Sequence, residues 1–336
     1  MRNSIYCTLS TLILVVVATA VWGQTVATKS AQQDERVVVG TNLVTVNVIV
    51  TDDNGRYVKG LTRDQFALYD EKIKQNIAHF SADASPVSLG IVLEVHENAR
   101  EKVKAALAAL REFTNTLQSR DDFFFVAFSE HGSLKSEFIP SANQVLEHLK
   151  VVRPGGPSAL YDALYLAADR LQRAHNLKKA ILVISDGQDE QSRHSYAELR
   201  SRLRTFDAQL YAIGIADPAR DPFAGYGRWV FEDVTRETGR RTFLMNAEAA
   251  MGRGVLAEMS RVSGGTTYYP DTESEPELTG ICTQIALELR AQYTLGFYPS
   301  ELSNKWRHLK IRVESPKRSP NYSLSYRKGY RLASGK

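Results

Sequence analysis

Four stretches in the middle of the chain consist almost entirely of apolar residues without regular alternation, at residues 88–94, 123–128, 180–184 and 209–215. Such stretches are typical of strands that are buried on both faces, as in a parallel sheet covered by helices. Apolar residues recur at helical spacing around them, over residues 99–117, 158–174 and 196–206. Strands that alternate with helices of this length indicate βαβ units. We therefore predict an α/β fold with one mainly parallel sheet between two helix layers, and a more polar strand at its edge, over residues 135–139.

Alternating patterns flank this centre on both sides. Valine occupies every second position from 44 to 50, which predicts a strand with one buried face. The Asp-Asp-Asn-Gly sequence at 52–55 predicts a hairpin turn, because Asn-Gly accepts positive φ angles. A helix is predicted over 276–293, and strands follow it. We therefore divide the chain into a β-rich N-terminal module (37–82), the α/β domain (83–293) and a basic C-terminal β extension (294–336).

The first 23 residues have the features of a signal peptide. Arg2 supplies a positive charge, residues 12–22 form an uncharged and mostly apolar core, and Gly23 offers a small residue for cleavage before Gln24. The apolar core is shorter than the roughly 20 residues that a spanning helix needs. We expect a flexible leader at 24–36 and a secreted or periplasmic protein without a stable membrane span after cleavage. An uncleaved anchor is the alternative.

The amino-acid composition indicates which interactions can stabilise such a protein. The chain has 336 residues, of which 43% are hydrophobic, so it has ample material for a core and does not resemble a disordered protein. Cleavage would leave Cys282 as the only cysteine, which excludes an internal disulfide. Cys282 lies on the apolar stripe of the helix predicted over 276–293, so we expect it to be a small buried hydrophobic side chain.

Positive charge is concentrated at the C-terminal end. Residues 301–336 contain ten lysines and arginines but only two acids, whereas the formal net charge of the whole chain is +4. We interpret the cations there as a solvated sheet face that blocks edge pairing, with a dedicated anion site as the alternative; they include Lys310, Arg312, Arg327, Lys328 and Arg331. No nucleic-acid role is expected, because the chain lacks a recognisable binding motif and an aromatic-interleaved basic groove.

Four motifs in the α/β region resemble those of a von Willebrand factor type A (VWA) domain. They are SLGIVLE, GGPSALYDAL, KKAILVISDGQD and QLYAIGIAD, and they lie between Val87 and Asp271. The flanks, VNVIVTDDNGRYVKGLTRDQFALYDE before the domain and LELRAQYTLGFYP after it, are similar to the acidobacterial VWFA-related family of exported proteins. The resemblance implies a Rossmann-like VWA domain with small β-rich modules at both ends.

The resemblance also implies a metal-ion-dependent adhesion site at the carboxyl edge of the sheet. The family's Asp-x-Ser-x-Ser motif falls on Glu94, His96 and Asn98, its threonine on Ser158 and its aspartate on Asp186. Glu94 is one methylene longer than aspartate, and His96 offers an imidazole in place of a hydroxyl. One alternative is a degenerate site, in which Glu94, His96 and Asp186 form a hydrogen-bonded polar cluster. The other is a mixed nitrogen and oxygen site that suits manganese or zinc rather than magnesium. We favour the degenerate site and expect no required cofactor.

None of the sequence patterns for common catalytic sites is present. The chain has no glycine-rich phosphate loop, no HExxH, no G-x-S-x-G and no cysteine nucleophile with a partner. His194 is interpreted as a surface side chain. We therefore predict a non-enzymatic binding or adhesion module that recognises a protein or cell-surface polymer at the carboxyl edge of its sheet. A structural scaffold subunit of an envelope assembly is the alternative, and a metal-dependent hydrolase is a distant third. The sequence leaves the oligomeric state open.

Overall fold

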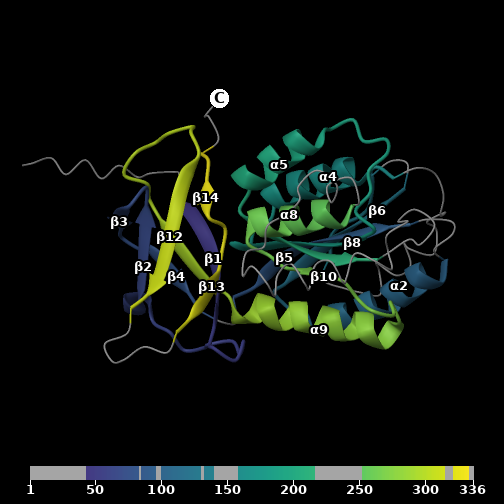
Figure 1. Cartoon of the computed structure of the whole chain (residues 1–336), viewed down its shortest axis with the longest axis horizontal. Coiled ribbons are helices and arrows are strands. Elements are labelled where there is room, and N and C mark those ends of the chain that lie inside the picture. Colours follow the sequence, from purple (N-terminus) through teal and green to yellow (C-terminus); the bar gives the residue numbers. More distant parts are fainter. Residues whose placement is uncertain are drawn as a thin grey trace, which may run out of the picture. The chain divides into compact units, whose positions relative to one another are not determined.

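The computed structural model describes seven stretches of the chain, residues 43–82, 85–95, 100–129, 132–139, 158–215, 252–314 and 321–332. They form a central sheet covered by helices and two further antiparallel sheets (Figure 1). The expected signal peptide (1–23) and leader (24–36) lie outside the described residues, as do His96 and Asn98. In the part of the chain that is described, no helix combines the length and apolar character needed to cross a membrane.

The four apolar stretches form neighbouring strands of one sheet, as predicted. The strand order is β10-β9-β8-β5-β6-β7. All neighbours are parallel except β6 and β7, so the more polar strand is antiparallel and lies at the edge. The bounds are β5 (Val87–Glu94), β6 (Asp122–Phe128), β7 (Gly132–Ile139), β8 (Lys178–Ser185), β9 (Ala208–Gly214) and β10 (Thr267–Tyr268).

Helices cover both faces of this sheet, which explains why its strands contain so few polar residues. One layer consists of α2 (Arg100–Asn115) and α9 (Glu275–Ala291), and the other of α4 (Leu160–Gln172), α5 (Tyr196–Thr205) and α8 (Arg253–Ser263). Successive strand residues point to opposite faces, so Ile91 packs in the first layer and Val92 in the second. The predicted α/β fold with two helix layers is confirmed. Cys282 is buried in the first layer, and burial raises the pKa of its thiol to about 12.

The flanking β-rich stretches are confirmed, and the structure joins them. One sheet has the order β13-β1-β11-β4 and the other β14-β12-β2-β3. Strand β1 pairs with β11 and strand β2 with β12, so each sheet combines strands from both ends of the chain. The bounds are β1 (Val44–Thr51), β2 (Phe66–Asp70), β3 (Ile73–Gln75), β4 (His79–Ser81), β11 (Tyr293–Phe297), β12 (Arg307–Val313), β13 (Ser323–Ser325) and β14 (Gly329–Tyr330). A short 3-10 helix, η1 (Arg63–Gln65), precedes β2.

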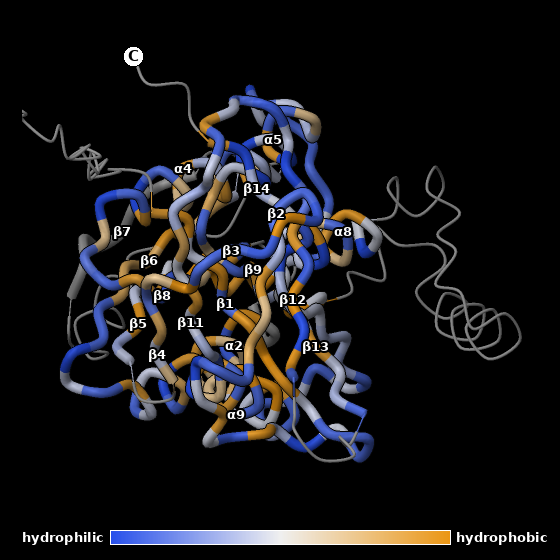
Figure 2. Tube along the Cα trace, turned by 90° about the vertical axis from the view of Figure 1, so that its left-hand side faces the viewer, coloured by the Kyte–Doolittle hydropathy of each residue, from blue (hydrophilic) through white to orange (hydrophobic). Residues whose placement is uncertain are grey.

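The two antiparallel sheets share one apolar core. Val46 and Val48 from β1, Leu295 from β11 and Leu309 from β12 pack together in it. The turn after β1 forms as the sequence predicts, with Gly55 at a φ of 73°. Figure 2 shows hydrophobic residues concentrated in the strands and hydrophilic residues in the connecting loops. We call this unit the β-sandwich.

Arg327 corrects one part of the charge interpretation. We expected it to face water, but only 6% of it is exposed. Its guanidinium donates to the carbonyl oxygens of Phe206 (3.1 Å) and Thr45 (2.5 Å) and pairs with Asp207 at 2.6 Å. The alternation of apolar and polar residues predicts which residues share a face of a strand. It does not predict whether another part of the protein packs on the polar face. Lys310 is exposed, as predicted.

A buried carboxyl group lies where α9 meets the β-sandwich. Glu288 is 7% exposed, and it accepts hydrogen bonds from the hydroxyls of Tyr268 and Thr266. Tyr57, from the loop after β1, and Tyr211, from β9, also place their hydroxyls beside this carboxyl. Burial raises the pKa of Glu288 in the folded protein, against the opposing effect of these hydroxyls.

This raised pKa predicts a pH-dependent stability. Between the ordinary glutamate pKa and the higher folded value, the folded state holds more protons than the unfolded state, so stability falls as pH rises. Replacing Glu288 with glutamine is therefore expected to raise the thermal midpoint at neutral pH, with a difference that shrinks as the pH falls towards 4.5. Thermal unfolding across this pH range tests it, with Glu112→Gln, at an exposed position of α2, as the control. Parallel pH profiles for wild type and Glu288→Gln would contradict the prediction.

Candidate functional site

Glu94 ends β5 at the carboxyl edge of the parallel sheet, where open α/β folds place their ligand sites. Only 7% of Glu94 is exposed. Its Oε2 accepts hydrogen bonds from the Ser185 hydroxyl (2.6 Å) and from the backbone N–H of Asp186 (3.0 Å). Ser185 Oγ in turn accepts from the N–H of Gly187 at 2.9 Å. The glutamate therefore ties the end of β5 to the end of β8, the strand beside it.

Asp186 is the first residue after β8 and is partly buried. Its Oδ1 accepts from the N–H of Gln188 at 2.8 Å, which makes the turn out of the sheet an Asx-type turn. Gly187 has a φ of 84°, in the left-handed region that glycine adopts without strain. The carboxyl group that the resemblance assigns to the metal site thus also shapes the loop that follows it.

Ser158 lies just before α4 and is completely buried. Its carbonyl oxygen accepts from the N–H groups of Glu190 (2.8 Å) and Gln191 (3.0 Å), so it anchors the loop after β8. Its hydroxyl oxygen has no hydrogen-bond partner in the structure. A buried hydroxyl without a partner costs free energy, so Ser158 keeps unused hydrogen-bonding capacity at this edge of the sheet.

The start of α4 is held by side chains that the sequence analysis did not single out. Asp189 Oδ1 accepts from the N–H of Tyr161 (2.9 Å), and Ser192 Oγ accepts from the N–H of Asp162 (3.0 Å). Ser192 also donates to Asp189 at 2.5 Å. The first N–H groups of a helix have no partner within it, so the loop after β8 stabilises α4. The dense polar run DGQDEQS at residues 186–192 was the available signal.

His194 is not an isolated surface side chain, which corrects its interpretation. Its Nδ1 lies 2.7 Å from Asp162 Oδ1, and its ring stacks on Tyr165 with centroids 3.9 Å apart. Burial acts to raise the pKa of Asp162, but hydrogen bonds from the backbone N–H groups of Arg193 and His194 outweigh it and lower the pKa. Among the described residues, no serine, threonine or cysteine hydroxyl or thiol bonds to His194, so this pair holds the loop on α4.

Glu94, Ser158 and Asp186 are the described residues of the metal-ion-dependent adhesion site that the resemblance implies. A hard cation needs several oxygen ligands converging on one point, and no cluster of three acidic, histidine or cysteine side chains occurs in the described ranges. Glu94 uses one carboxylate oxygen for Ser185 and Asp186. Of the five expected ligands, the structure places Glu94, Ser158 and Asp186, while His96 and Asn98 lie outside it.

No family model matches the chain. It is similar to several solved structures, each at low identity. A von Willebrand factor type A protein from Catenulispora acidiphila is 12% identical over 80% of this chain and 72% of that chain, with a TM-score of 0.45. The vWF domain of the type V pili tip protein Mfa5 from Porphyromonas gingivalis is 16% identical over 32% of this chain and 40% of its own, with a TM-score of 0.30.

A third similar structure is proximal thread matrix protein 1 from the mussel byssus, whose MIDAS motif is occupied by zinc. It is 14% identical over 64% of this chain and 48% of its own, with a TM-score of 0.46. The present chain thus spans less than half the length of Mfa5 and of the mussel protein. None of these likenesses says what the present chain binds. Membership of the acidobacterial family stays a prediction. The strand order and the two helix layers make the region from β5 to α9 a VWA-like domain, as the sequence resemblance implied.

Proposed function

We propose that this protein is a non-enzymatic, exported binding module that recognises a protein or cell-surface polymer at the carboxyl edge of its parallel sheet. The observation that carries the proposal is the use of Glu94 as an internal hydrogen-bond acceptor, which fixes the edge without an ion. The loop after β8 is further pinned to α4 through Asp189. A rigid edge favours binding, because little conformational freedom is lost when a ligand docks.

The pinned loop presents polar side chains outward. Glu190, Gln191 and Arg193 are exposed, and Glu190 Oε2 also accepts from the backbone N–H of Ser158 at 3.3 Å. These three side chains are the contacts that we assign to the ligand. A structural subunit of an envelope assembly is the second candidate. It is favoured by Ile73, which is 58% exposed on β3 at the end of one β-sandwich sheet.

Two matched variants separate the candidates in a pull-down from envelope extract of the native host. Arg193→Glu reverses a charge on the loop after β8, and Ile73→Lys places a charge on β3. For a binder, Arg193→Glu should weaken capture of the retained ligand about tenfold, equivalent to about 1.4 kcal/mol, while Ile73→Lys leaves it unchanged. The reverse pattern would favour the scaffold, and unchanged capture by both variants would overturn the proposal.

The proposed module works without magnesium or calcium. Calorimetric titration of the metal-free protein is expected to give no saturable heat with either ion. Asp186→Asn is the informative variant, because its amide oxygen can still accept from Gln188 while the charge is gone. We expect it to leave the thermal midpoint unchanged with or without chelator.

Manganese and zinc are tested in the same titration. A bound ion at a hundredfold excess over its Kd would stabilise the fold by about 2.7 kcal/mol. A saturable magnesium isotherm in wild type that disappears in Asp186→Asn would show the site to be a working magnesium site. The same result with manganese or zinc alone would favour the mixed nitrogen and oxygen site over the degenerate one.

A further inference from the structure

A cavity of about 480 Å³ lies between α5 and the C-terminal part of the β-sandwich. Its charged lining consists of Arg200 and Arg204 from α5 and Lys305 and Arg331 from the β-sandwich, and no acidic residue lines it. Trp306 contributes an aromatic wall. The volume is in the range of small-molecule sites, which run from about 300 to 1,000 Å³. The cavity therefore combines the size of a ligand site with charge of one sign.

Most of this positive charge is not neutralised by the protein. Arg200 donates from Nε (3.2 Å) and Nη2 (3.0 Å) to Glu258. In the described chain, no carboxylate lies within ion-pair distance of Arg204, Lys305 or Arg331. Like charges that share a cavity repel one another, and burial, followed by the neighbouring charge of Arg200, lowers the pKa of Arg204. An anion in the cavity would relieve this repulsion.

Arg204 is held ready for such a ligand. Its guanidinium carbon lies 5.0 Å from the centre of the Trp306 ring, in a cation–π contact. Its Nε is buried and has no hydrogen-bond acceptor in the structure. A buried donor without an acceptor costs free energy, and more so when the group is charged. Arg204 thus has a fixed position and an unused donor beside the cavity.

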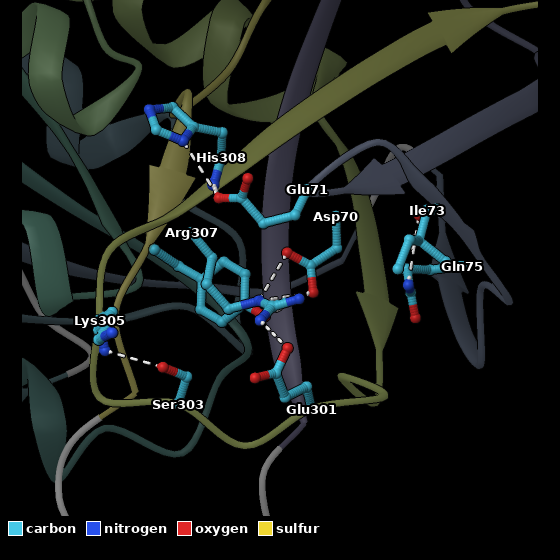
Figure 3. A network of polar contacts seen from close by, with 10 residues as sticks. Asp70, Glu71, Ile73, Gln75, Glu301, Ser303, Lys305, Arg307 and His308 are labelled. Atoms are coloured by element: carbon cyan, nitrogen blue, oxygen red, sulfur yellow. Dashed lines mark hydrogen bonds and ion pairs between the residues drawn. The ribbon is translucent and has the colours of Figure 1, made fainter.

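A network of polar contacts around Asp70 and Arg307 holds the β-sandwich residues that are next to the cavity lining in the chain (Figure 3). Arg307 Nε lies 3.0 Å from both carboxylate oxygens of Asp70, and the Tyr330 hydroxyl donates to Asp70 at 3.0 Å. Trp306 directly precedes Arg307, and Arg331 directly follows Tyr330. The Asp70 network therefore positions two lining residues through their neighbours in the chain.

Arg331 and Asn304 connect these two segments. Arg331 Nε donates to the carbonyl oxygen of Asn304 at 2.6 Å. This contact still leaves the terminal nitrogens of Arg331 available, because a guanidinium carries five N–H donors. On the other side, Leu199 and Leu203 bury one face of α5 and so fix the helix. The lining cations are thus carried by segments that need not rearrange.

We propose that this cavity binds a ligand that carries a phosphate ester. A phosphate monoester carries about −1.5 to −2 charges and three strong acceptor oxygens, which matches three cations without carboxylate partners. Arginine is suited to it, because its planar fork donates two parallel hydrogen bonds to a phosphate. The remaining volume and the Trp306 wall accommodate the organic part of the ligand. This site is separate from the carboxyl-edge loops of the proposed function.

The phosphate can belong to a small molecule or to a lipid headgroup, and the experiment distinguishes the two. The full-length protein is titrated calorimetrically with glucose 6-phosphate and with glucose. It is also sedimented with phosphatidylcholine vesicles that contain or lack phosphatidic acid, whose headgroup is a phosphate monoester. Saturable binding of glucose 6-phosphate but not glucose supports the small-molecule source. Binding only to the vesicles with phosphatidic acid supports the lipid source.

Charge variants then locate the site. Arg204→Gln and Lys305→Gln should each weaken binding about tenfold, equivalent to about 1.4 kcal/mol. Arg312→Gln removes an exposed cation of β12 that does not line the cavity, so it should leave binding unchanged. Lys305 is exposed, so its variant tests the site even if Arg204→Gln lowers the thermal midpoint. Equal losses in Arg312→Gln, or no saturable binding of either phosphate probe, would overturn the proposal.

Discussion

Replacing Asp70 with asparagine is expected to lower the free energy of unfolding by about 3–5 kcal/mol, because it breaks a buried ion pair from one side. The Asp70 side chain is fully buried and that of Arg307 is 7% exposed. The hydrogen bond to Asp70 raises the pKa of Arg307 in the wild type. Without that carboxylate the guanidinium still stays charged, because arginine is not deprotonated in proteins near neutral pH. Glu301, the other partner of Arg307, is 73% exposed and compensates poorly for the loss. The Tyr330 hydroxyl would also face an amide instead of a carboxylate.

Urea denaturation followed by circular dichroism measures this change, with Glu314→Gln as the control. Glu314 pairs with Lys74 at 3.8 Å, and their side chains are 53% and 60% exposed. Exposed pairs contribute about 0–1 kcal/mol, so the control should shift the urea midpoint only slightly. Similar losses in the two variants would mean that the Asp70 pair is no more important than a surface contact. Asp70→Asn should also weaken phosphate binding, because Asp70 positions Trp306 and Arg331 through their neighbours.

The sequence predicted the α/β domain well because its pattern reports burial directly. Ile91 and Val92 point to opposite faces of the sheet and are both buried, so β5 shows an uninterrupted apolar run. A strand with that pattern must be packed against other elements on both faces. The apolar residues at helical spacing between the strands identified those elements as helices. Glu94 and Asp186 follow from the same reasoning, since both stand where a buried strand ends.

The pattern of apolar and polar residues could not predict that the two flanking β stretches pair with each other. Alternation in β1 specifies its apolar face but not its partner, and Val46 pairs with Leu295, far away in the sequence. The prediction of one buried face was wrong, because Thr45 and Asn47 on the other face are buried as well. The Asp70–Arg307 pair did leave a signal. Arg307 has the same phase along β12 as Leu309 and Ile311, which marks it as an inward-facing charge that needs a partner.

The candidate sites were predictable to different extents. The hydrogen bond from Ser185 to Glu94 depends on the register of β5 against β8, which the residues alone do not define. The basic excess at the C-terminal end was visible, and Lys310 and Arg312 are exposed as a solvated face requires. The cavity, in contrast, is formed only when α5 packs against the β-sandwich. Its charges come from two distant segments.

Gly187→Ala tests whether the loop after β8 is fixed by close backbone contact. A Cβ atom on Gly187 would lie 2.2 Å from the carbonyl oxygen of Gly252, at the start of α8, and no side chain could move aside to relieve the contact. The φ of 84° adds about 1–2 kcal/mol for a residue with a Cβ. Overpacking of this kind costs about 1–3 kcal/mol. We expect a total loss of about 2–5 kcal/mol in the free energy of unfolding.

Gly55→Ala is the matched control, because it separates the cost of the backbone angle from the cost of the contact. Gly55 has a φ of 73°, but a Cβ there would meet no atom within 4 Å, so only about 1–2 kcal/mol should be lost. Gly187 also donates to Ser185, which donates to Glu94, so a displaced loop would release the carboxyl edge. Gly187→Ala should therefore also reduce ligand capture, whereas Gly55→Ala should not. Equal stability losses, with capture intact in both, would mean that the contact with Gly252 relaxes easily and does not hold the edge.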